Sequence, residues 1–287
     1  KSDPRGAYAD NLAGLVRSAL GIEDSRSGDR EGEGGSDGRR RRIVDIGGGT
    51  GNFARMIVGD GSSVEAVVVD PFLERSSGLG DDDGAIEFVK ADAETYALSP
   101  GEVPPPSDWG DGGSSDGVAS WWRTGYHQVL LKEMIHHVSA ERRVDIFRGL
   151  RAGTADLPSR ADGGMSMTIP PSLLIITRPR TKIDFPLWPA ARDVWAANQP
   201  SSESIAADVA TAGYSDVTTK IHAYPCEIEL ERWCEMIRDR FWSTFSNFDD
   251  RGLEDGIDHI RGEWGAKADS KGRIKFEDRL LFITARK

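Results

Sequence analysis

Residues 42–58 read RIVDIGGGTGNFARMIV: a short apolar run, a glycine-rich turn, and a stretch that suits a helix. Glycine adopts positive φ and has no side chain, so such a turn can bring its backbone close to a bound ligand. Backbone N–H groups at the start of the following helix can then point at an anion. The stretch is typical of the opening of a nucleotide-binding α/β domain.

Strand-like and helix-like segments alternate after this turn, which favours an α/β fold with a mainly parallel sheet. We expect strands at 42–46, 64–70, 86–91, 126–131, 172–177, 216–222 and 275–285, and helices at 6–20, 52–58, 139–150 and 202–212. Helix-patterned segments outside the alternation, at 183–198, 229–246 and 253–264, are expected to form a cap.

The formal net charge of −11 disfavours a partner that is bound through its phosphates, because Lys and Arg must supply that attraction. Two cysteines form neither a disulfide framework nor a metal-binding set. No apolar run reaches the roughly 20 residues that span a bilayer. We expect a soluble cytoplasmic protein, monomeric or homodimeric, with no nucleic acid or membrane partner. Because the chain begins with Lys1, a removed upstream segment could instead direct it to an organelle.

Three alternate glycines follow an acidic residue in the turn, in the pattern Asp45-x-Gly47-x-Gly49-x-Gly51. This pattern resembles that of class I S-adenosylmethionine-dependent methyltransferases, in the small-molecule branch (methyltransferase type 11/25-like). The resemblance implies a Rossmann-like, doubly wound seven-stranded sheet with an antiparallel last strand, plus a helical cap. It also implies S-adenosyl-L-methionine as cofactor, bound by these four residues. The looser dinucleotide pattern Gly49-x-Gly51-x-x-Ala54 fits as well.

Two further acids follow the next strands. VEAVVVDP ends in Asp70 and Pro71, about 20 residues after the glycine turn, where an acid can accept hydrogen bonds from ribose hydroxyls. Asp70 could also be a turn residue ahead of Pro71. In IEFVKADAET, the resemblance implies that Asp92 contacts the adenine amino group and that the Ala93 N–H faces the ring. Asp92 could alternatively cap the following helix.

The segment YHQVLLKEMIHHV resembles the fourth-strand signature of the same family. The resemblance implies that Lys132 and Glu133 lie beside the methionine part of the cofactor, and that the histidine pair lies near the site of methyl transfer. Our first candidates for a catalytic base are His136 and His137, because a neutral histidine accepts protons near neutral pH. Tyr8 and Glu133 are the second candidates. The pair could instead only dock the next helix. We expect no metal, since the five histidines show no convincing ligand spacing around the pair.

We interpret the chain as one methyltransferase domain. It would comprise an N-terminal helix (1–22), a flexible linker (23–42), a cofactor-binding half (43–180) and helical cap segments (181–200 and 226–265). The basic run at the end of the linker suggests a solvated face. Low-complexity stretches at 76–84, 99–116 and 151–164 suggest surface insertions.

The cap is expected to supply the substrate pocket. Trp188 and Trp233 could line it, and Arg178 and Arg240 could pair with an acidic substrate. The aromatic residues could equally form a core, and the arginines a solvated surface. The leading hypothesis is methyl transfer to an O, N or S atom of a small molecule. A protein that binds S-adenosylmethionine without catalysis and an NAD-dependent oxidoreductase are the alternatives.

Overall fold

The computed structural model describes residues 4–22, 40–59, 64–73, 85–104, 122–123, 125–156 and 170–287. The expected linker and the stretch at 76–84 lie largely or wholly outside them, as do most of the other two low-complexity stretches. The chain divides into two compact units. The first is made of Lys1–Ile176, Ala206–Thr218 and Ile283–Lys287, and the second of Thr177–Ile205 and Thr219–Phe282.

A seven-stranded sheet runs in the order β3-β2-β1-β4-β5-β7-β6. Its parallel strands are β1 (Arg41–Ile46), β2 (Val64–Val69), β3 (Ile86–Val89), β4 (Gln128–Lys132) and β5 (Leu173–Thr177). Every residue of β5 is buried, as are four of the five in β4. Continuous apolar runs of this kind are typical of strands covered on both faces, which is why the sequence located them.

The last strand is antiparallel, as the resemblance implies. β6 (Ser215–Glu229) forms one edge of the sheet and β7 (Arg273–Arg286) lies between it and β5. Ser172, just before β5, donates its N–H to the carbonyl of Ala285 near the end of β7. Thr218, near the start of β6, lies 2.6 Å from Thr284, hydroxyl to hydroxyl. β7 therefore runs against both neighbours.

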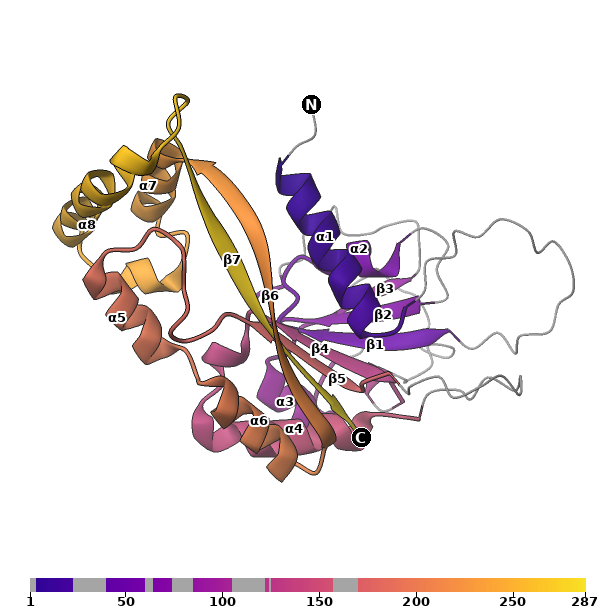
Figure 1. Cartoon of the computed structure of the whole chain (residues 1–287). Coiled ribbons are helices and arrows are strands. Elements are labelled where there is room, and N and C mark those ends of the chain that lie inside the picture. The colour runs from indigo at the N-terminus through magenta and orange to yellow at the C-terminus, as the bar shows by residue number, and fades with distance from the viewer. Residues whose placement is uncertain are drawn as a thin grey trace, which may run out of the picture. The chain divides into compact units, whose positions relative to one another are not determined.

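Helices cover both faces of the sheet in the first unit (Figure 1). α1 (Pro4–Ala19) and α2 (Asn52–Val58) pack together on one face, and α3 (Ala93–Leu98) and α4 (Ala140–Gly153) pack together on the other. α6 (Ser202–Thr211) follows later in the chain. α3 was not among the expected helices, because its six residues are too few to show a periodic apolar face; only the alternative role of Asp92 as a helix cap implied it. α4 extends to Gly153, so the expected insertion at 151–164 begins inside a helix.

Part of the basic run has a structural role instead of forming only a solvated face. The Arg41 guanidinium donates to the carbonyls of Leu20 and Gly21, at 2.8 and 2.7 Å, just beyond the end of α1. The buried Gln128 side chain also donates to Leu20, at 2.9 Å. These donors satisfy carbonyls that the end of a helix leaves unpaired, and the arginine charge complements the helix dipole there. They hold the end of α1 against β1 and β4.

His127 provides a pH-dependent contact between β1 and the residue that precedes β4. Its Nδ1 accepts the backbone N–H of Arg42 at 2.9 Å, and the backbone N–H of His127 donates to the carbonyl of Arg42. Burial lowers the pKa of His127, and the charges of Arg42 and Arg41 lower it further. The native state therefore needs the neutral imidazole, whereas the unfolded chain takes up a proton near pH 6.5.

Stability contributed by His127 is therefore fully present above about pH 6.5 and is lost as the pH falls below that value. The expected loss at acid pH is of the order of one hydrogen bond, about 0.5–1.5 kcal/mol. Urea unfolding of wild type and His127→Asn at pH 7.5 and 5.5 tests this, since an asparagine oxygen can accept the same bond without titrating. Equal pH dependence in the two proteins would show that His127 is not responsible.

The second unit has a helical part with its own core. It contains α5 (Pro189–Asn198), α7 (Leu230–Arg238), α8 (Asp250–Trp264) and the 3-10 helices η4 (Ser243–Asn247) and η5 (Gly265–Lys267). Fully buried members of the core are Leu187, Ala191, Cys234, Ile237, Phe245, Ile257, Ile260 and Ile274. The expected helix at 183–198 starts only at Pro189, because proline is favoured in the first turn of a helix and disfavoured inside one.

β6 continues to Glu229, past its expected end at His222. The strand contains Pro225, which normally argues against a strand because it cannot donate to a ladder. β6 is an edge strand, however, so one side of its backbone needs no partner. Its alternating half-buried and exposed side chains complete a regular strand pattern up to Glu229.

Candidate cofactor site

The glycine turn joins β1 to α2 at the carboxyl edge of the sheet. Gly47, Gly49 and Gly51 have φ of 75°, 56° and 74°, values that side chains of L-residues rarely allow. The Gly47 N–H donates to the carbonyl of Val69 at 2.7 Å, which ties the turn to the end of β2. This accounts physically for the spacing of the three glycines.

Among the described residues, one of these glycines has more room around it than the others. A Cβ on Gly51 would lie 2.7 Å from the Phe88 ring, and one on Gly47 would lie 2.9 Å from Met134. Gly48 is packed just as closely, because its Cβ would lie 2.6 Å from a carboxylate oxygen of Asp45. At Gly49 no atom of the described residues lies within 4 Å of the Cβ position. The turn is thus supported from beneath and accessible at Gly49.

Asp70 holds the turn from the neighbouring strand end. One carboxylate oxygen accepts the Gly49 N–H at 2.9 Å, and the other accepts the Phe72 N–H at 2.8 Å. Both interpretations of Asp70 are therefore compatible, since it stabilises a strand-end turn and also lies beside the open glycine. Pro71 is exposed, and Phe72 is 87% exposed next to it.

Asp45 is a buried acid beneath the turn. It is 2% exposed, and its Oδ1 has no hydrogen-bond partner among the described residues. Burial raises its pKa to about 7; the charge of Lys132 opposes the rise and that of Asp70 adds to it. The Lys132 ammonium lies 4.8 Å from the centre of the Phe53 ring, in the first turn of α2. These charged groups occupy the same edge of the sheet as the turn.

Asp92 caps α3. Its carboxylate accepts the Thr95 N–H at 2.7 Å and also contacts the Thr95 hydroxyl at 3.1 Å. Ala93, the first residue of the helix, is buried. A hollow of about 310 Å³ begins beside Asp92 and continues along Glu94 and Arg142, whose side chains form an ion pair. The adenine contact inferred for Asp92 and Ala93 stays a prediction.

The histidine pair follows β4 on the same edge. Glu133 has a φ of 55°, and its N–H still donates to the carbonyl of Ile176, at 2.7 Å. The chain then forms the 3-10 helix η3 (Ile135–His137), in which the two imidazole rings lie 4.1 Å apart, centre to centre. His136 is half-buried and His137 is exposed. Tyr8, the other candidate base, lies half-buried in α1.

The architecture follows from the strand order, together with the glycine turn and the acids at the ends of β1, β2 and β3. It is the doubly wound order with an antiparallel β7 inserted beside β5. The fold is that of the class I methyltransferases.

No protein-family model matches the sequence, and no curated protein is similar to it. The methyltransferase fold does have solved relatives. A SAM-dependent methyltransferase from Archaeoglobus fulgidus is 13% identical, with a TM-score of 0.47. The match covers 97% of this chain and 94% of that protein. A cyclopropane synthase from Mycobacterium tuberculosis is 14% identical with a TM-score of 0.44, covering 95% and 83%.

A phosphoethanolamine N-methyltransferase from Haemonchus contortus is also similar. It is 13% identical with a TM-score of 0.43, and the match covers 98% of this chain and 58% of the relative. That structure contains phosphomonomethylethanolamine and S-adenosylhomocysteine. At such identities and TM-scores, none of these three proteins bears on the substrate of this chain.

The substrate candidates of the cap all lie in the second unit of the methyltransferase fold. Trp188 and Trp233 are 7% and 1% exposed and belong to its core, where Trp233 donates to the carbonyl of Pro186 at 2.7 Å. Arg240 bonds Asp250 at 2.8 Å. A substrate contact by any of these three stays a prediction, but their positions in the structure fit the core and surface alternatives.

Arg178 is the most constrained of the four candidates. Its guanidinium makes two hydrogen bonds to the carboxylate of Asp278, at 2.9 and 3.0 Å. It also lies over the rings of Phe185 and Trp242, at 5.5 and 5.6 Å from their centres. The Asp278 side chain is 3% exposed and that of Arg178 is 15% exposed. Asp278 therefore neutralises the charge of Arg178, and the two rings hold its guanidinium in place within the second unit.

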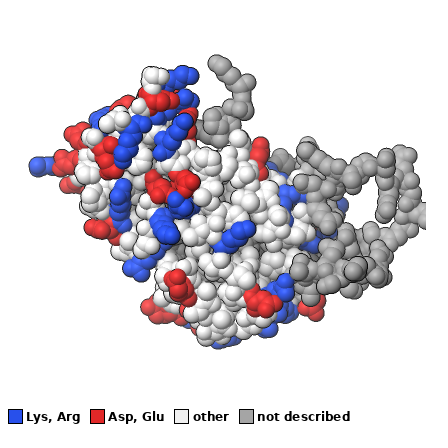
Figure 2. Space-filling model, in the orientation of Figure 1, with Lys and Arg blue, Asp and Glu red and all other residues white. Residues whose placement is uncertain are grey.

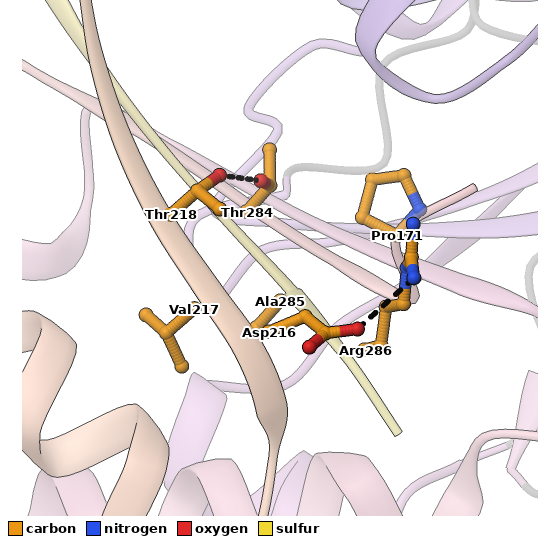
Figure 3. Close-up of a pocket in the computed structure, with 7 residues that line it drawn as sticks. All are labelled: Pro171, Asp216, Val217, Thr218, Thr284, Ala285 and Arg286. Atoms are coloured by element: carbon orange, nitrogen blue, oxygen red, sulfur yellow. Dashed lines mark hydrogen bonds and ion pairs between the residues drawn. The ribbon is translucent and has the colours of Figure 1, made fainter. Parts of the chain in front are cut away.

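A second hollow lies in another part of the first unit. Figure 3 shows it, with a volume of about 360 Å³, between the segment that leads into β5, the start of β6 and the end of β7. Asp216 and Arg286 form an ion pair of 3.0 Å at its wall. The parallel strands begin at this edge of the sheet, so the hollow is on the opposite edge from the glycine turn.

Three residues of the glycine-turn edge were not predicted from the sequence. Gly48 leaves room for the Asp45 carboxylate, Phe53 supports Lys132, and Phe72 is an exposed ring beside Asp70. An aromatic residue two positions after a strand-end acid is a signal that could have drawn attention to Phe72. Among the described residues no three His, Cys, Asp or Glu side chains group together as a metal site, and no helix is long and apolar enough to cross a bilayer.

Proposed function

We propose that this chain is an S-adenosylmethionine-dependent methyltransferase that methylates an O, N or S atom of a small molecule. One observation carries the proposal. Gly49 is open at its Cβ position, and its N–H is held by Asp70 at the carboxyl edge of a class I methyltransferase sheet. Ligands of open α/β sheets bind at this edge.

The residues present fit the cofactor. Asp70 would accept hydrogen bonds from the ribose hydroxyls, and the open Gly49 would let the ligand approach the backbone. Pro71, Asp92 and Ala93 would border the adenine. When bound, S-adenosylmethionine supplies a methyl group on a positively charged sulfur. The chain has to align the acceptor with that methyl group and exclude water.

Charge supports a small molecule as the methyl acceptor. The chain carries a net charge of −11. Figure 2 shows Lys and Arg intermixed with Asp and Glu over the part of the second unit that contains α7 and α8. Exposed pairs such as Arg238 with Glu254 and Arg261 with Glu231 account for this mixing. Binding to nucleic acid phosphates would instead require a surface with an excess of positive charge.

The deciding experiment is calorimetric titration of the full chain with S-adenosylmethionine, S-adenosylhomocysteine and NADH. We expect micromolar binding of the two methionine-derived ligands and none of NADH. Release of S-adenosylhomocysteine in the presence of candidate acids, amines, alcohols and thiols then tests for catalysis. Preferential binding of NADH would assign the glycine turn to a dinucleotide. Tight binding without turnover of any acceptor would favour a binding protein.

His136 is the first candidate for the base, because it is half-buried where His137 is exposed. For a hydroxyl, thiol or ammonium acceptor, His136→Gln is expected to lower kcat by about 100- to 10,000-fold, as the loss of a general base does. His137→Gln serves as the matched control and should change kcat less than threefold, roughly the scatter of such comparisons. Both variants should bind S-adenosylhomocysteine like wild type.

A carboxylate acceptor needs no proton removed, so in that case His136→Gln should leave kcat unchanged. A large loss in His137→Gln alone would transfer the role to the exposed histidine. Unchanged kcat in both variants with a hydroxyl acceptor would leave Tyr8 and Glu133 as the remaining candidates, to be tested by Tyr8→Phe and Glu133→Gln.

A further inference from the structure

The hollow in Figure 3 is bordered by two pairs of polar residues that join β6 to β7. Asp216 and Arg286 form the ion pair, and the hydroxyls of Thr218 and Thr284 share a hydrogen bond of 2.6 Å. Residues two positions apart along a strand lie on the same face, which is why both pairs border one hollow. A carboxylate, a guanidinium and two hydroxyls therefore lie within reach of one small molecule.

Asp216 has an unusual backbone conformation for a residue in a strand. Its φ is 50°, in the left-handed region that residues other than glycine rarely adopt. Residues held in this way are concentrated at ligand sites. In the structure, Asp216 and the three residues Thr218, Thr219 and Lys220 are exposed, so the described part of the chain leaves this end of β6 accessible.

The two charges at the wall of the hollow exclude a ligand with a single charge. An anion that binds Arg286 is repelled by Asp216, and a cation that binds Asp216 is repelled by Arg286. A ligand with both charges on neighbouring atoms pairs with both residues. The side chains of Asp216 and Arg286 are 62% and 38% exposed, and an ion pair this exposed contributes little to stability, so it can exchange partners.

The other groups of the hollow suit the same kind of ligand. Arg286 donates to Asp216 through Nη1, and a guanidinium can bind a carboxylate with two parallel hydrogen bonds. Of the two threonine hydroxyls, the one that accepts the shared bond keeps its own O–H as a donor. Pro171, Val217 and Ala285 add apolar surface. The volume of about 360 Å³ suits a small ligand with a short aliphatic part.

We propose that this hollow is a second ligand site, which binds a small zwitterionic amino acid. The ammonium of the ligand pairs with Asp216, and its carboxylate pairs with Arg286. The hollow is on the opposite edge of the sheet from the glycine turn, so this ligand is separate from the proposed cofactor and takes no part in methyl transfer. The site does not depend on the proposed function.

The test is an NMR titration of the full chain with three ligands that differ in charge. L-valine carries both charges, N-acetyl-L-valine only the carboxylate, and L-valinamide only the ammonium. We expect a dissociation constant of about 1 mM for L-valine, because its two ion pairs have to offset the freedom lost on binding. Each singly charged ligand should bind about tenfold more weakly or less, since it leaves one charge of the hollow repelled.

Two variants assign the charges. Arg286→Gln should lower the affinity for L-valine about tenfold and remove its advantage over L-valinamide. Asp216→Asn should remove the advantage over N-acetyl-L-valine, and asparagine tolerates the left-handed backbone. Arg148→Gln, which removes an arginine from an exposed ion pair with Asp145 on α4, is the matched control and should change none of the affinities.

Several results would overturn the site. One is that neither L-valine nor the smaller glycine binds at concentrations well above the expected dissociation constant. Another is that L-valine binds Asp216→Asn and Arg286→Gln as it binds wild type. A loss of L-valine binding in Asp70→Ala but not in Arg286→Gln would place the amino acid at the glycine turn. If the chain binds L-valine at this hollow but not S-adenosylhomocysteine, the site stands and the proposed function fails.

Discussion

Asp278→Ala is expected to destabilise the second unit by about 3–5 kcal/mol, the usual cost of leaving a buried charge without its partner. The Asp278 side chain is 3% exposed and accepts two hydrogen bonds from Arg178. In the variant, the positive charge of Arg178 would stay in place without this partner. Urea unfolding followed by tryptophan fluorescence measures the loss. Five of the eight tryptophans lie in the second unit, at 188, 195, 233, 242 and 264.

The chain contains a matched control for this prediction. Arg238 and Glu254 form a similar two-bonded pair, but their side chains are 38% and 50% exposed. Glu254→Ala should therefore cost about 1 kcal/mol or less. Replacing both members of the buried pair, Arg178→Met with Asp278→Leu, should recover much of the stability. If Asp278→Ala and Glu254→Ala are equally stable, burial does not determine the strength of the Arg178 pair.

Asp70→Ala is expected to weaken S-adenosylhomocysteine binding by at least about 100-fold. The substitution would remove the hydrogen bonds that we propose between the carboxylate and the ribose hydroxyls, and bonds to a charged group contribute about 1.5–3 kcal/mol each. It would also release the Gly49 N–H, which the carboxylate now holds at 2.9 Å. Calorimetric titration of the variant beside wild type gives the ratio of dissociation constants.

Asp70→Asn separates the ligand contact from support of the turn. The asparagine amide keeps one oxygen that can accept the Gly49 N–H, so the melting temperature of the variant should stay near that of wild type. Its affinity for S-adenosylhomocysteine should still fall about tenfold or more. Asp145→Ala, which removes an exposed acid on α4, should leave affinity unchanged. Wild-type affinity in Asp70→Ala would show that this acid is only a turn residue.

The glycine turn and the buried strands could be predicted because their signals are local. Gly47, Gly49 and Gly51 need positive φ, and continuous apolar runs mark strands covered on both faces. α2 and the first four strands accordingly lie within a few residues of their expected bounds. The order of the strands was implied only by the resemblance that the turn carries.

The sequence could not show which partner each side chain meets. Trp188 and Trp233 suit a core and a pocket wall equally well, and only the structure places them in the core of the second unit. Arg178 was a candidate for an acidic substrate, but its partner Asp278 comes a hundred residues later in the chain. Pro225 likewise argues against a strand until β6 is known to be an edge.

The sequence by itself determined the fold class, the position of the glycine turn and the strand-end acids Asp45, Asp70 and Asp92, because backbone conformation and apolar periodicity depend on nearby residues. Only the tertiary structure decided that Gly49, of the three turn glycines, has no atom of the described residues near its Cβ position, that Lys132 lies on the same face as Asp45, and that Arg178 is neutralised. Those facts depend on contacts between strands and helices far apart in sequence, which no local pattern encodes.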